Sequence, residues 1–271
     1  YRVEDMPLPT ATRDKDRGVP DVAIRHGANY DIFNQYEQTP ENMRRATWGY
    51  YACASYVDWC IGNVLDTLAK TGLADRTMVV FYSDHGFHLG EHGCWSKFTI
   101  FEQSIRVPLI VCVPGMETKG QVCDEIVELV DILPTLCDFW EVPASPRFEG
   151  ISFRPLLTDP DRPWKKAALS MITLGGQGRS VRTKQYRNAE YRKDRSWPGK
   201  GPAPFARELY DLEQDPWEQH NLVDDPGHRA VRDNLERLLR EGWKVALPQG
   251  SAIHHQKGVI DRVYGACAVL Q

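Results

Sequence analysis

One segment of the sequence has a long, uninterrupted helical periodicity. It opens with Thr39-Pro40-Glu41, in which a hydroxyl N-cap precedes a proline at the first helical position and an acidic side chain in the first turn. Apolar side chains then recur at spacings of three and four, and the pattern stops at Gly72. The segment therefore predicts one long amphipathic helix, whose apolar positions are Met43, Ala46, Tyr50, Ala54, Val57, Ile61, Val64, Leu65 and Leu68.

Two short apolar runs follow this helix. Residues 77–83 are β-branched and aromatic, and a second run covers residues 107–113. Such runs are typical of strands buried on both faces, as in a parallel sheet. A short helix is expected from Asp131 onward, over the letters D-I-L-P-T-L. A helix, a buried strand, a loop, a second strand and a further helix indicate an α/β layered domain.

The pattern changes after about residue 160. Short strand-like pieces alternate with Gly and Pro clusters, and a last amphipathic helix is expected near residues 227–241. This order predicts a small antiparallel sheet with one helix. We therefore expect two domains, residues 1–160 and residues 161–271, and the strand-like pieces of the second are 167–173, 180–183, 185–192 and 208–212.

Composition excludes several classes of protein. The 271 residues include 33 basic and 37 acidic side chains, which leave a formal charge of -4. This balance provides no electrostatic attraction for nucleic acid or an anionic membrane, so neither is an expected partner. The longest apolar run is far shorter than the ~20 residues of a membrane-spanning helix. The seven cysteines have no repeated C-x-x-C spacing and predict neither a zinc knuckle nor a disulfide framework.

The chemically informative stretch is the loop of residues 83–97, directly after the first predicted strand. It contains three histidines, two carboxylates and a lysine, together with three glycines that allow sharp turns. Ligands and catalytic groups of open α/β sheets gather at the carboxyl ends of strands. Asp84 and His85 supply a carboxylate oxygen and an imidazole nitrogen, which suits a divalent cation. Lys97 supplies a positive charge suited to an anionic group.

Alternative interpretations of this loop remain open. In a purely structural one, Asp84 caps a turn, His85 packs against it and Lys97 is solvated. A second alternative comes from His88-Leu89-Gly90-Glu91-His92, which matches the H-x-x-E-H signature of inverted zinc peptidases. That chemistry requires both histidines on one face of a helix, and the glycine inside the motif disfavours a helix.

The strongest interpretation is a family resemblance. The loop pattern S-D-H-G-x-x-L-G-E-H-G-x-W-x-K resembles the metal and sulfate loop of sulfatases, in the alkaline phosphatase superfamily. The variant with His after the Asp is similar to iduronate-2-sulfatase and its bacterial relatives. Further segments resemble the family in the family's order, over residues 51–58, 61–65, 106–110, 130–136 and 149–152 and in the pattern E-L-Y-D-L-x-x-D-P-x-E-x-x-N-L of residues 208–222.

The resemblance implies a fold, an activity and a set of roles. The fold would be part of a mixed sheet sandwiched by helices, followed by the small C-terminal sheet. Sulfatases cleave sulfate esters with a formylglycine nucleophile and a divalent cation, usually Ca²⁺, with Mg²⁺ or Mn²⁺ as alternatives. By this resemblance Asp84 and His85 would be metal ligands, and Lys97 would contact sulfate and act in catalysis. His92, as a catalytic residue, and Trp95, as a substrate-binding residue, would line the mouth of the site, unless they only pack the loop.

The sequence also departs from the family pattern. None of the seven cysteines is followed by x-P-S-R, and no serine begins that motif. The family's first Asp-Asp metal pair is also absent, since Asp224-Asp225 follows the C-terminal signature in a turn. We therefore expect these residues to correspond to the C-terminal half of a sulfatase, with the nucleophile on an N-terminal half that acts as its partner, and we expect the chain alone to be inactive.

The expected substrate is a sulfate ester, with sulfated carbohydrates as one class. Two alternatives to this function stay open: a phosphonate or phosphodiester monoester hydrolase of the same superfamily, and a non-catalytic binding fragment.

Overall fold

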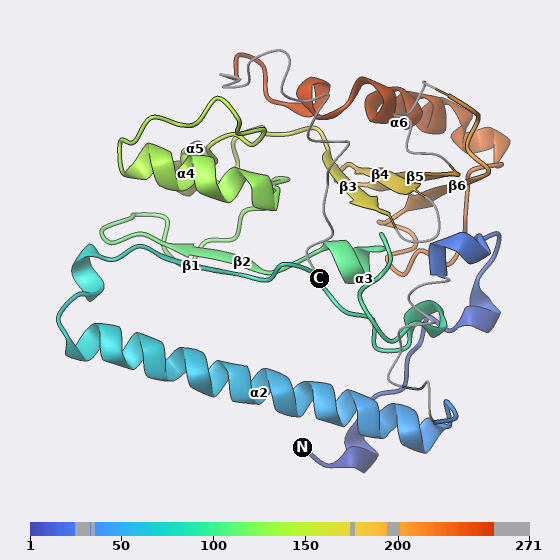
Figure 1. The fold of residues 1–271 in the computed structure, drawn as a ribbon, viewed down its shortest axis with the longest axis horizontal. Helices are drawn as coiled ribbons and strands as arrows, with labels where there is room; N and C mark the ends of the chain where they lie inside the picture. Colours follow the sequence, from blue (N-terminus) through green and yellow to red (C-terminus); the bar gives the residue numbers. More distant parts are fainter. Residues whose placement is uncertain (25–32, 34–35, 174–176, 194–200, 252–271) are drawn as a thin grey trace. The chain divides into compact units, whose positions relative to one another are not determined.

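A computed structural model describes residues 1–24, 33, 36–173, 177–193 and 201–251 (Figure 1). The chain forms two compact units: unit 1 comprises Tyr1–Gly115 and Leu169–Val245, and unit 2 comprises Met116–Ala168 and Ala246–Gln271. This division differs from the predicted boundary after residue 160, because the chain leaves unit 1 after residue 115 and returns to it at residue 169. Short 3-10 helices lie at Val3–Asp5, Arg13–Lys15, Ala74–Arg76, Glu91–Gly93, Leu129–Asp131, Pro226–His228 and Trp243–Ala246.

The predicted long helix of unit 1 is confirmed as α2, Pro40–Lys70 (Figure 1). The side chain of Thr39 accepts a hydrogen bond from the backbone N–H of Asn42 at 3.3 Å and so caps the helix. The chain leaves the helix through Gly72, which has a φ of 68°. Of the side chains of α2, all of them described, only Thr47 is buried. No helix in the described ranges is both long and apolar enough to span a bilayer.

The two apolar runs form a two-stranded sheet in unit 1. Strand β1, Val79–Tyr82, pairs with β2, Leu109–Cys112, and the pairing is antiparallel. The prediction of a buried parallel strand is therefore wrong for this chain. The connection of residues 83–108 contains no crossover helix, so β2 starts beside the end of β1 and runs back along it. A two-stranded ribbon cannot cover both of its faces, and the side chains of Tyr82 and Ile110 are exposed.

The predicted C-terminal antiparallel sheet is confirmed. It has four strands in the order β3-β4-β5-β6, with antiparallel pairing of β4 with β5 and of β5 with β6. Helix α6, Arg229–Glu241, contacts β4 and β5, and its leucines at 235, 238 and 239 are buried. The strand bounds are Ala168–Ile172, Gln177–Arg182, Tyr186–Arg192 and Ala206–Asp211.

The core of unit 1 joins segments that are distant in the sequence. A short helix, α3, Glu102–Ile105, follows the chemically informative loop, and the apolar residues just before it pack against β5 and β6. Residues of the N-terminal segment join the same cluster. This packing fixes the loop against the C-terminal sheet, through the buried residues Val19, Ala23, Ile100, Phe101, Ala189, Tyr191 and Tyr210.

Unit 2 contains two short helices, α4, Ile132–Phe139, and α5, Arg154–Thr158. A buried lysine organises it: Lys165 donates hydrogen bonds to both carboxylate oxygens of Asp131, at 2.8 and 2.7 Å, and to Glu128 at 2.7 Å. The two carboxylates compensate the positive charge of the buried lysine.

Candidate functional site

The candidate site begins where β1 ends. The hydroxyl of Ser83 donates to the carbonyl of His85 at 2.7 Å and closes a turn that takes the chain out of the strand. The side chain of Asp84 is 81% exposed, whereas that of His85 is one-third exposed. The carboxylate Oδ2 of Asp84 lies 3.5 Å from Nε2 of His85, so the two neighbours face a common point.

Lys97 reaches the same point from the far end of the loop. Its Nζ lies 2.7 Å from Nε2 of His85, while Nδ1 of that ring lies 2.7 Å from the carbonyl oxygen of Gly86. A carbonyl only accepts, so Nδ1 carries the proton and Nε2 accepts from the ammonium. The structure thus brings Asp84, His85 and Lys97 together around the imidazole Nε2.

The donor set around this point suits part of a cation site. A carboxylate oxygen and an imidazole nitrogen are acceptable ligands for a divalent cation, although Ca²⁺ takes six to eight oxygens. Within the ranges that the structure describes, no group of three or more His, Cys, Asp or Glu side chains is arranged to hold a metal. Asp84 and His85 therefore fit as two ligands of a larger shell and not as a complete site.

His92 and Trp95 lie elsewhere. Both are buried, with exposed fractions of 1% and 0%, so in this chain they do not line the mouth of a site as predicted. The ring of His92 stacks on Phe101 with centroids 4.2 Å apart, and Trp95 packs edge-on against Phe33 at 4.9 Å. Their large flat rings fill the interior of the loop, which agrees with the alternative that they pack it.

The inverted-peptidase alternative does not agree with the geometry. His88 and His92 lie on a loop with a short 3-10 turn, and His92 has a φ of 55°, outside the helical region. The ring of His88 points to the hydroxyl of Thr99, with its Nε2 2.7 Å from Oγ1. Burial, with the neighbouring His92 as a smaller cause, lowers the pKa of His88 to about 3. His88 is therefore a neutral structural residue.

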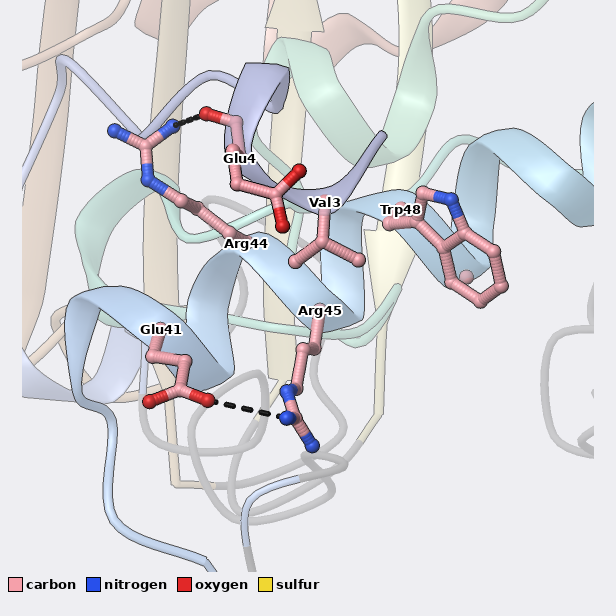
Figure 2. Close-up of a pocket in the computed structure, with 7 residues that line it drawn as sticks. Val3, Glu4, Glu41, Arg44, Arg45 and Trp48 are labelled. Atoms are coloured by element: carbon pink, nitrogen blue, oxygen red, sulfur yellow. Dashed lines mark hydrogen bonds and ion pairs between the residues drawn. The ribbon is translucent and has the colours of Figure 1, made fainter. Parts of the chain in front are cut away.

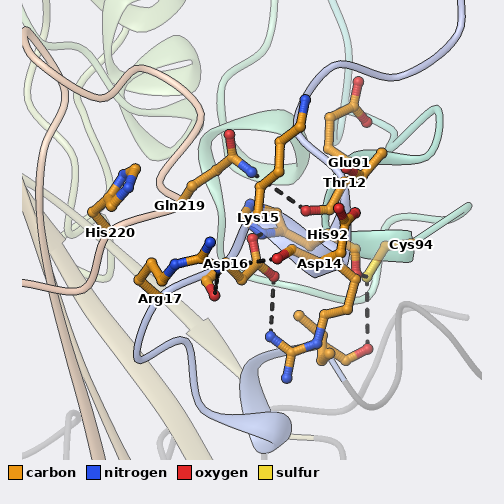
Figure 3. Close-up of polar contacts among 12 residues, drawn as sticks. Thr12, Asp14, Lys15, Asp16, Arg17, Glu91, His92, Cys94, Gln219 and His220 are labelled. Atoms are coloured by element: carbon orange, nitrogen blue, oxygen red, sulfur yellow. Dashed lines mark hydrogen bonds and ion pairs between the residues drawn. The ribbon is translucent and has the colours of Figure 1, made fainter.

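The N-terminal segment braces the loop from one side (Figure 3). Nδ1 of His92 lies 2.9 Å from the carboxylate of Asp16, and both side chains are inaccessible to solvent. Arg13 donates to the same carboxylate at 3.0 Å. The backbone N–H of Arg17 donates to the carbonyl of Gln219 at 2.7 Å, which links this segment to the C-terminal signature. Residues 12–17 thus connect the loop to residues 219–221.

A buried ionic cluster supports the loop from the side of the sheet. Arg187 on β5 is fully buried, donates from Nε to Glu218 and lies 3.5 Å from Glu208 through Nη1. Burial opposes the charge of Arg187, but the two carboxylates outweigh it and raise its pKa. Burial also raises the pKa of Glu218, against the effect of Arg187.

Two tyrosines complete this cluster. Tyr191 and Tyr210 donate their hydroxyls to the two carboxylate oxygens of Glu208, at 2.8 and 2.7 Å. Burial, followed by the charge of Glu208, raises the pKa of both phenols well above the ordinary value. Both hydroxyls therefore stay protonated and keep donating.

Sequence reasoning missed this cluster. A charged residue is usually exposed, so the sequence around Arg187 and Glu218 does not by itself indicate that they are buried. The period of two along β5 does indicate it for Arg187: Arg187, Ala189 and Tyr191 share one face of the strand, and the last two are of types that favour burial.

An open pocket of about 790 Å³ lies apart from these residues (Figure 2). It lies between the start of α2 and the first residues of the chain. Its two arginines already have partners, since Arg45 lies 3.1 Å from the carboxylate of Glu41 and Arg44 donates to the backbone carbonyl of Glu4 at 3.3 Å. The pocket contains none of the candidate site residues.

Comparisons with known proteins identify the family. Residues 25–141 match the sulfatase family, and residues 90–244 match the family described as N-sulphoglucosamine sulphohydrolase, C-terminal. A choline-sulfatase of Rhizobium meliloti is 32% identical over 72% of this chain and 36% of its own length. An iduronate 2-sulfatase of Mus musculus is 28% identical over 84% of this chain and 55% of its own.

Solved structures agree with the fold. A phosphonate monoester hydrolase from Silicibacter pomeroyi superposes with a TM-score of 0.73 and 26% identity, over 92% of this chain and 52% of its own. A protein solved in complex with its substrate D-glucosamine-2-N,6-O-disulfate superposes with a TM-score of 0.66 and 28% identity, over 73% of this chain and 40% of its own. The predicted sulfatase-like α/β fold is therefore confirmed.

The chain spans about half the length of the relatives and solved structures that it matches, or less. The match to the C-terminal family alone covers more than half of the 271 residues, and the sulfatase match includes the loop with Asp84, His85 and Lys97. The chain belongs to the sulfatase family.

Proposed function

We propose that this chain supplies part of the metal and sulfate site of a sulfuric ester hydrolase. The observation that carries the proposal is the convergence of Asp84, His85 and Lys97 on one point at the end of β1, with Lys97 Nζ 2.7 Å from His85 Nε2. Family membership supports the reaction class.

Each residue has a defined role in this proposal. Asp84 and His85 hold a divalent cation, with Ca²⁺ the expected ion, through a carboxylate oxygen and Nε2. When bound, the cation polarises the oxygens of the sulfate group and stabilises the negative charge that develops on them. Gly86 orients the imidazole by accepting from Nδ1. Lys97 donates to the sulfate and stabilises the same developing charge from the protein side.

The nucleophile is proposed to lie outside this sequence. None of the seven cysteines begins a C-x-P-S-R motif. We expect the chain alone to bind its cation weakly and to have no turnover, and we expect a segment carrying that motif to complete the site. The substrate proposed for the complete protein is a sulfated carbohydrate, because one matched structure holds a disulfated glucosamine and one relative is an iduronate 2-sulfatase.

A second candidate is a phosphonate monoester hydrolase. The match to the Silicibacter pomeroyi enzyme of that name favours it, since the cation and the lysine would serve either tetrahedral anion. A lobe that binds but does not catalyse is the remaining alternative.

The test compares this chain with the chain joined to a segment that carries C-x-P-S-R. Hydrolysis of sulfate, phosphate-diester and phosphonate esters is measured for both, and a preference for sulfate supports the first proposal.

Lys97→Ala should lower kcat/KM in the joined protein by about 100-fold or more, because a charge-stabilising donor is lost. The control Lys70→Ala changes an exposed lysine of α2 and should leave kcat/KM unchanged. Turnover by the chain alone would contradict the proposal of an external nucleophile, and absence of turnover in a correctly folded joined protein would favour the non-catalytic lobe.

A further inference from the structure

Helix α3 contacts both ends of the loop that carries the site. The carbonyl of Ser104 accepts a hydrogen bond from the backbone N–H of Gly86 at 2.8 Å. The hydroxyl of Ser104 lies 2.8 Å from that of Thr99, which in turn lies 2.7 Å from Nε2 of His88. A four-residue helix thus holds the loop both just after His85 and just after Lys97.

The backbone at Gly86 packs so closely against α3 that no side chain fits there. A Cβ at this position would lie 2.0 Å from the carbonyl oxygen of Gln103, which is backbone and cannot turn away. The carbonyl of Gly86 also accepts from Nδ1 of His85, which aims Nε2 at Lys97. A displacement of α3 would therefore move Gly86 and rotate the imidazole.

The C-terminal half of unit 1 holds the first residue of α3 in two ways. The carboxylate of Glu218 accepts from the backbone N–H of Glu102 through Oε2 at 2.7 Å. The side chain of Glu102 is bound by Arg182 of β4 through two hydrogen bonds of 3.0 Å. Glu218 is fully buried and has a φ of 58°, a conformation that its surroundings must impose.

Arg187 holds Glu218 in turn. Its guanidinium donates to the second oxygen of Glu218 and lies over the rings of Phe101 and Tyr210, at 4.9 and 5.0 Å from their centroids. A buried ion pair is weak evidence for added stability, because desolvation opposes the attraction between the charges. Its geometric effect is to fix the carboxylate of Glu218, which accepts the hydrogen bond from the first residue of α3.

We propose that Glu218, held by Arg187, is a positioning residue for His85 and Lys97 that acts through the backbone of Glu102 and Gly86. The inference rests on the proposed function for the identity of the reacting groups, whereas the geometry that it describes is tested without any activity. It assigns a role to the glutamate of the C-terminal signature, which lies 121 residues after Lys97 in the sequence.

The first test is hydrogen exchange in this chain with Glu218→Gln. In this variant the backbone N–H of Gly86, which donates to Ser104, should exchange about tenfold faster than the loss in the variant's free energy of unfolding predicts. The control is Leu239→Ala, which removes a buried side chain of α6 and lowers the stability of unit 1 without touching α3. Nuclear Overhauser contacts between the ε-methylene of Lys97 and the ring of His85 should weaken in Glu218→Gln and persist in the control. Equal changes in the two variants would overturn the proposal.

If Glu218→Gln does not fold, Arg182→Gln tests whether the anchoring of α3 holds the backbone at Gly86. The side chain of Arg182 is one-fifth exposed, and the change removes the other anchor of Glu102. The exchange of the Gly86 amide should then accelerate about threefold, and no acceleration would overturn the role of α3.

In the joined protein, Glu218→Gln should lower kcat about tenfold with little change in KM, and an unchanged kcat would overturn the positioning role. A joined protein with no sulfatase activity would instead refute the proposed function, and the exchange and Overhauser results would still decide whether Glu218 positions the pair.

Discussion

Lys97 occupies the nitrogen of His85 that a cation would use. Its Nζ lies 2.7 Å from Nε2, and Nδ1 is committed to the carbonyl of Gly86. An ammonium at this distance repels a divalent cation that approaches the same lone pair. In the proposed function, binding of a cation at Nε2 would require Lys97 to move away, and its ammonium would then be available to an anion.

The first prediction concerns this competition. Lys97→Met removes the charge and keeps much of the length of the side chain, so the affinity for Ca²⁺ or Mn²⁺ should rise about tenfold. Isothermal titration of the purified chain measures it. Lys70→Met, on the exposed face of α2, is the matched control and should not change the affinity. An equal or weaker affinity in Lys97→Met would show that the lysine does not compete with the cation.

The second prediction concerns the backbone approach beneath the site. Gly86→Ala places a methyl group against the backbone of Gln103 and should lower the free energy of unfolding by about 1–3 kcal/mol. Gly62→Ala is the control, because Gly62 lies within α2 with open space around it, and alanine there should raise stability by up to about 1 kcal/mol. Urea unfolding measures both. Equal stability of Gly86→Ala and the unchanged chain would contradict the close contact.

Local patterns were enough to predict much of this architecture. The helix bounds of α2 follow from the cap at Thr39 and the glycine at position 72, and both act within one turn of the helix end. The grouping of Asp84, His85 and Lys97 was expected from a motif of fifteen residues. The C-terminal strands were recognisable because apolar runs alternate with turn residues.

Features that depend on distant partners were not predictable in this way. The direction of β1 relative to β2 depends on which strand lies beside it, and the composition of a strand does not specify its neighbour. The pairing of Arg187 with Glu218 joins residues 31 positions apart and has no local pattern. The buried ring of Trp95 packs against Phe33, a partner that no motif within the loop could reveal.

The third prediction concerns the exposed apolar face of α2. Tyr56 and Trp59 stack on each other with centroids 5.9 Å apart, and they are 65% and 63% exposed. Clustered aromatic surface favours association, so the purified chain should self-associate as its concentration rises. Substituting both residues with lysine should shift it toward the monomer in sedimentation velocity. The control is Trp217→Lys, which changes an exposed tryptophan outside α2 and should not shift the chain toward the monomer. A chain that stays monomeric at every concentration would contradict this prediction.

The fourth prediction concerns the pH dependence of stability. Burial lowers the pKa of His88 to about 3, whereas a histidine in an unfolded chain titrates near 6.5. Below pH 6.5 the unfolded chain therefore binds a proton that the folded chain does not, and stability falls as the pH falls toward 3. Between pH 7.5 and pH 5 this histidine should lower the free energy of unfolding by about 2 kcal/mol.

His88→Gln removes this titration and keeps an amide that can reach the hydroxyl of Thr99. Urea unfolding of both proteins at pH 7.5 and pH 5 measures how much free energy of unfolding each loses between the two pH values. The variant should lose about 2 kcal/mol less, because the contributions of the other histidines cancel in the comparison. Between pH 7.5 and pH 8.5 the difference between the two proteins should stay constant, since His88 is neutral in both states there. Equal losses at pH 5 would mean that His88 is protonated in the folded chain, which its closed surroundings of Thr99, His92 and Phe101 oppose.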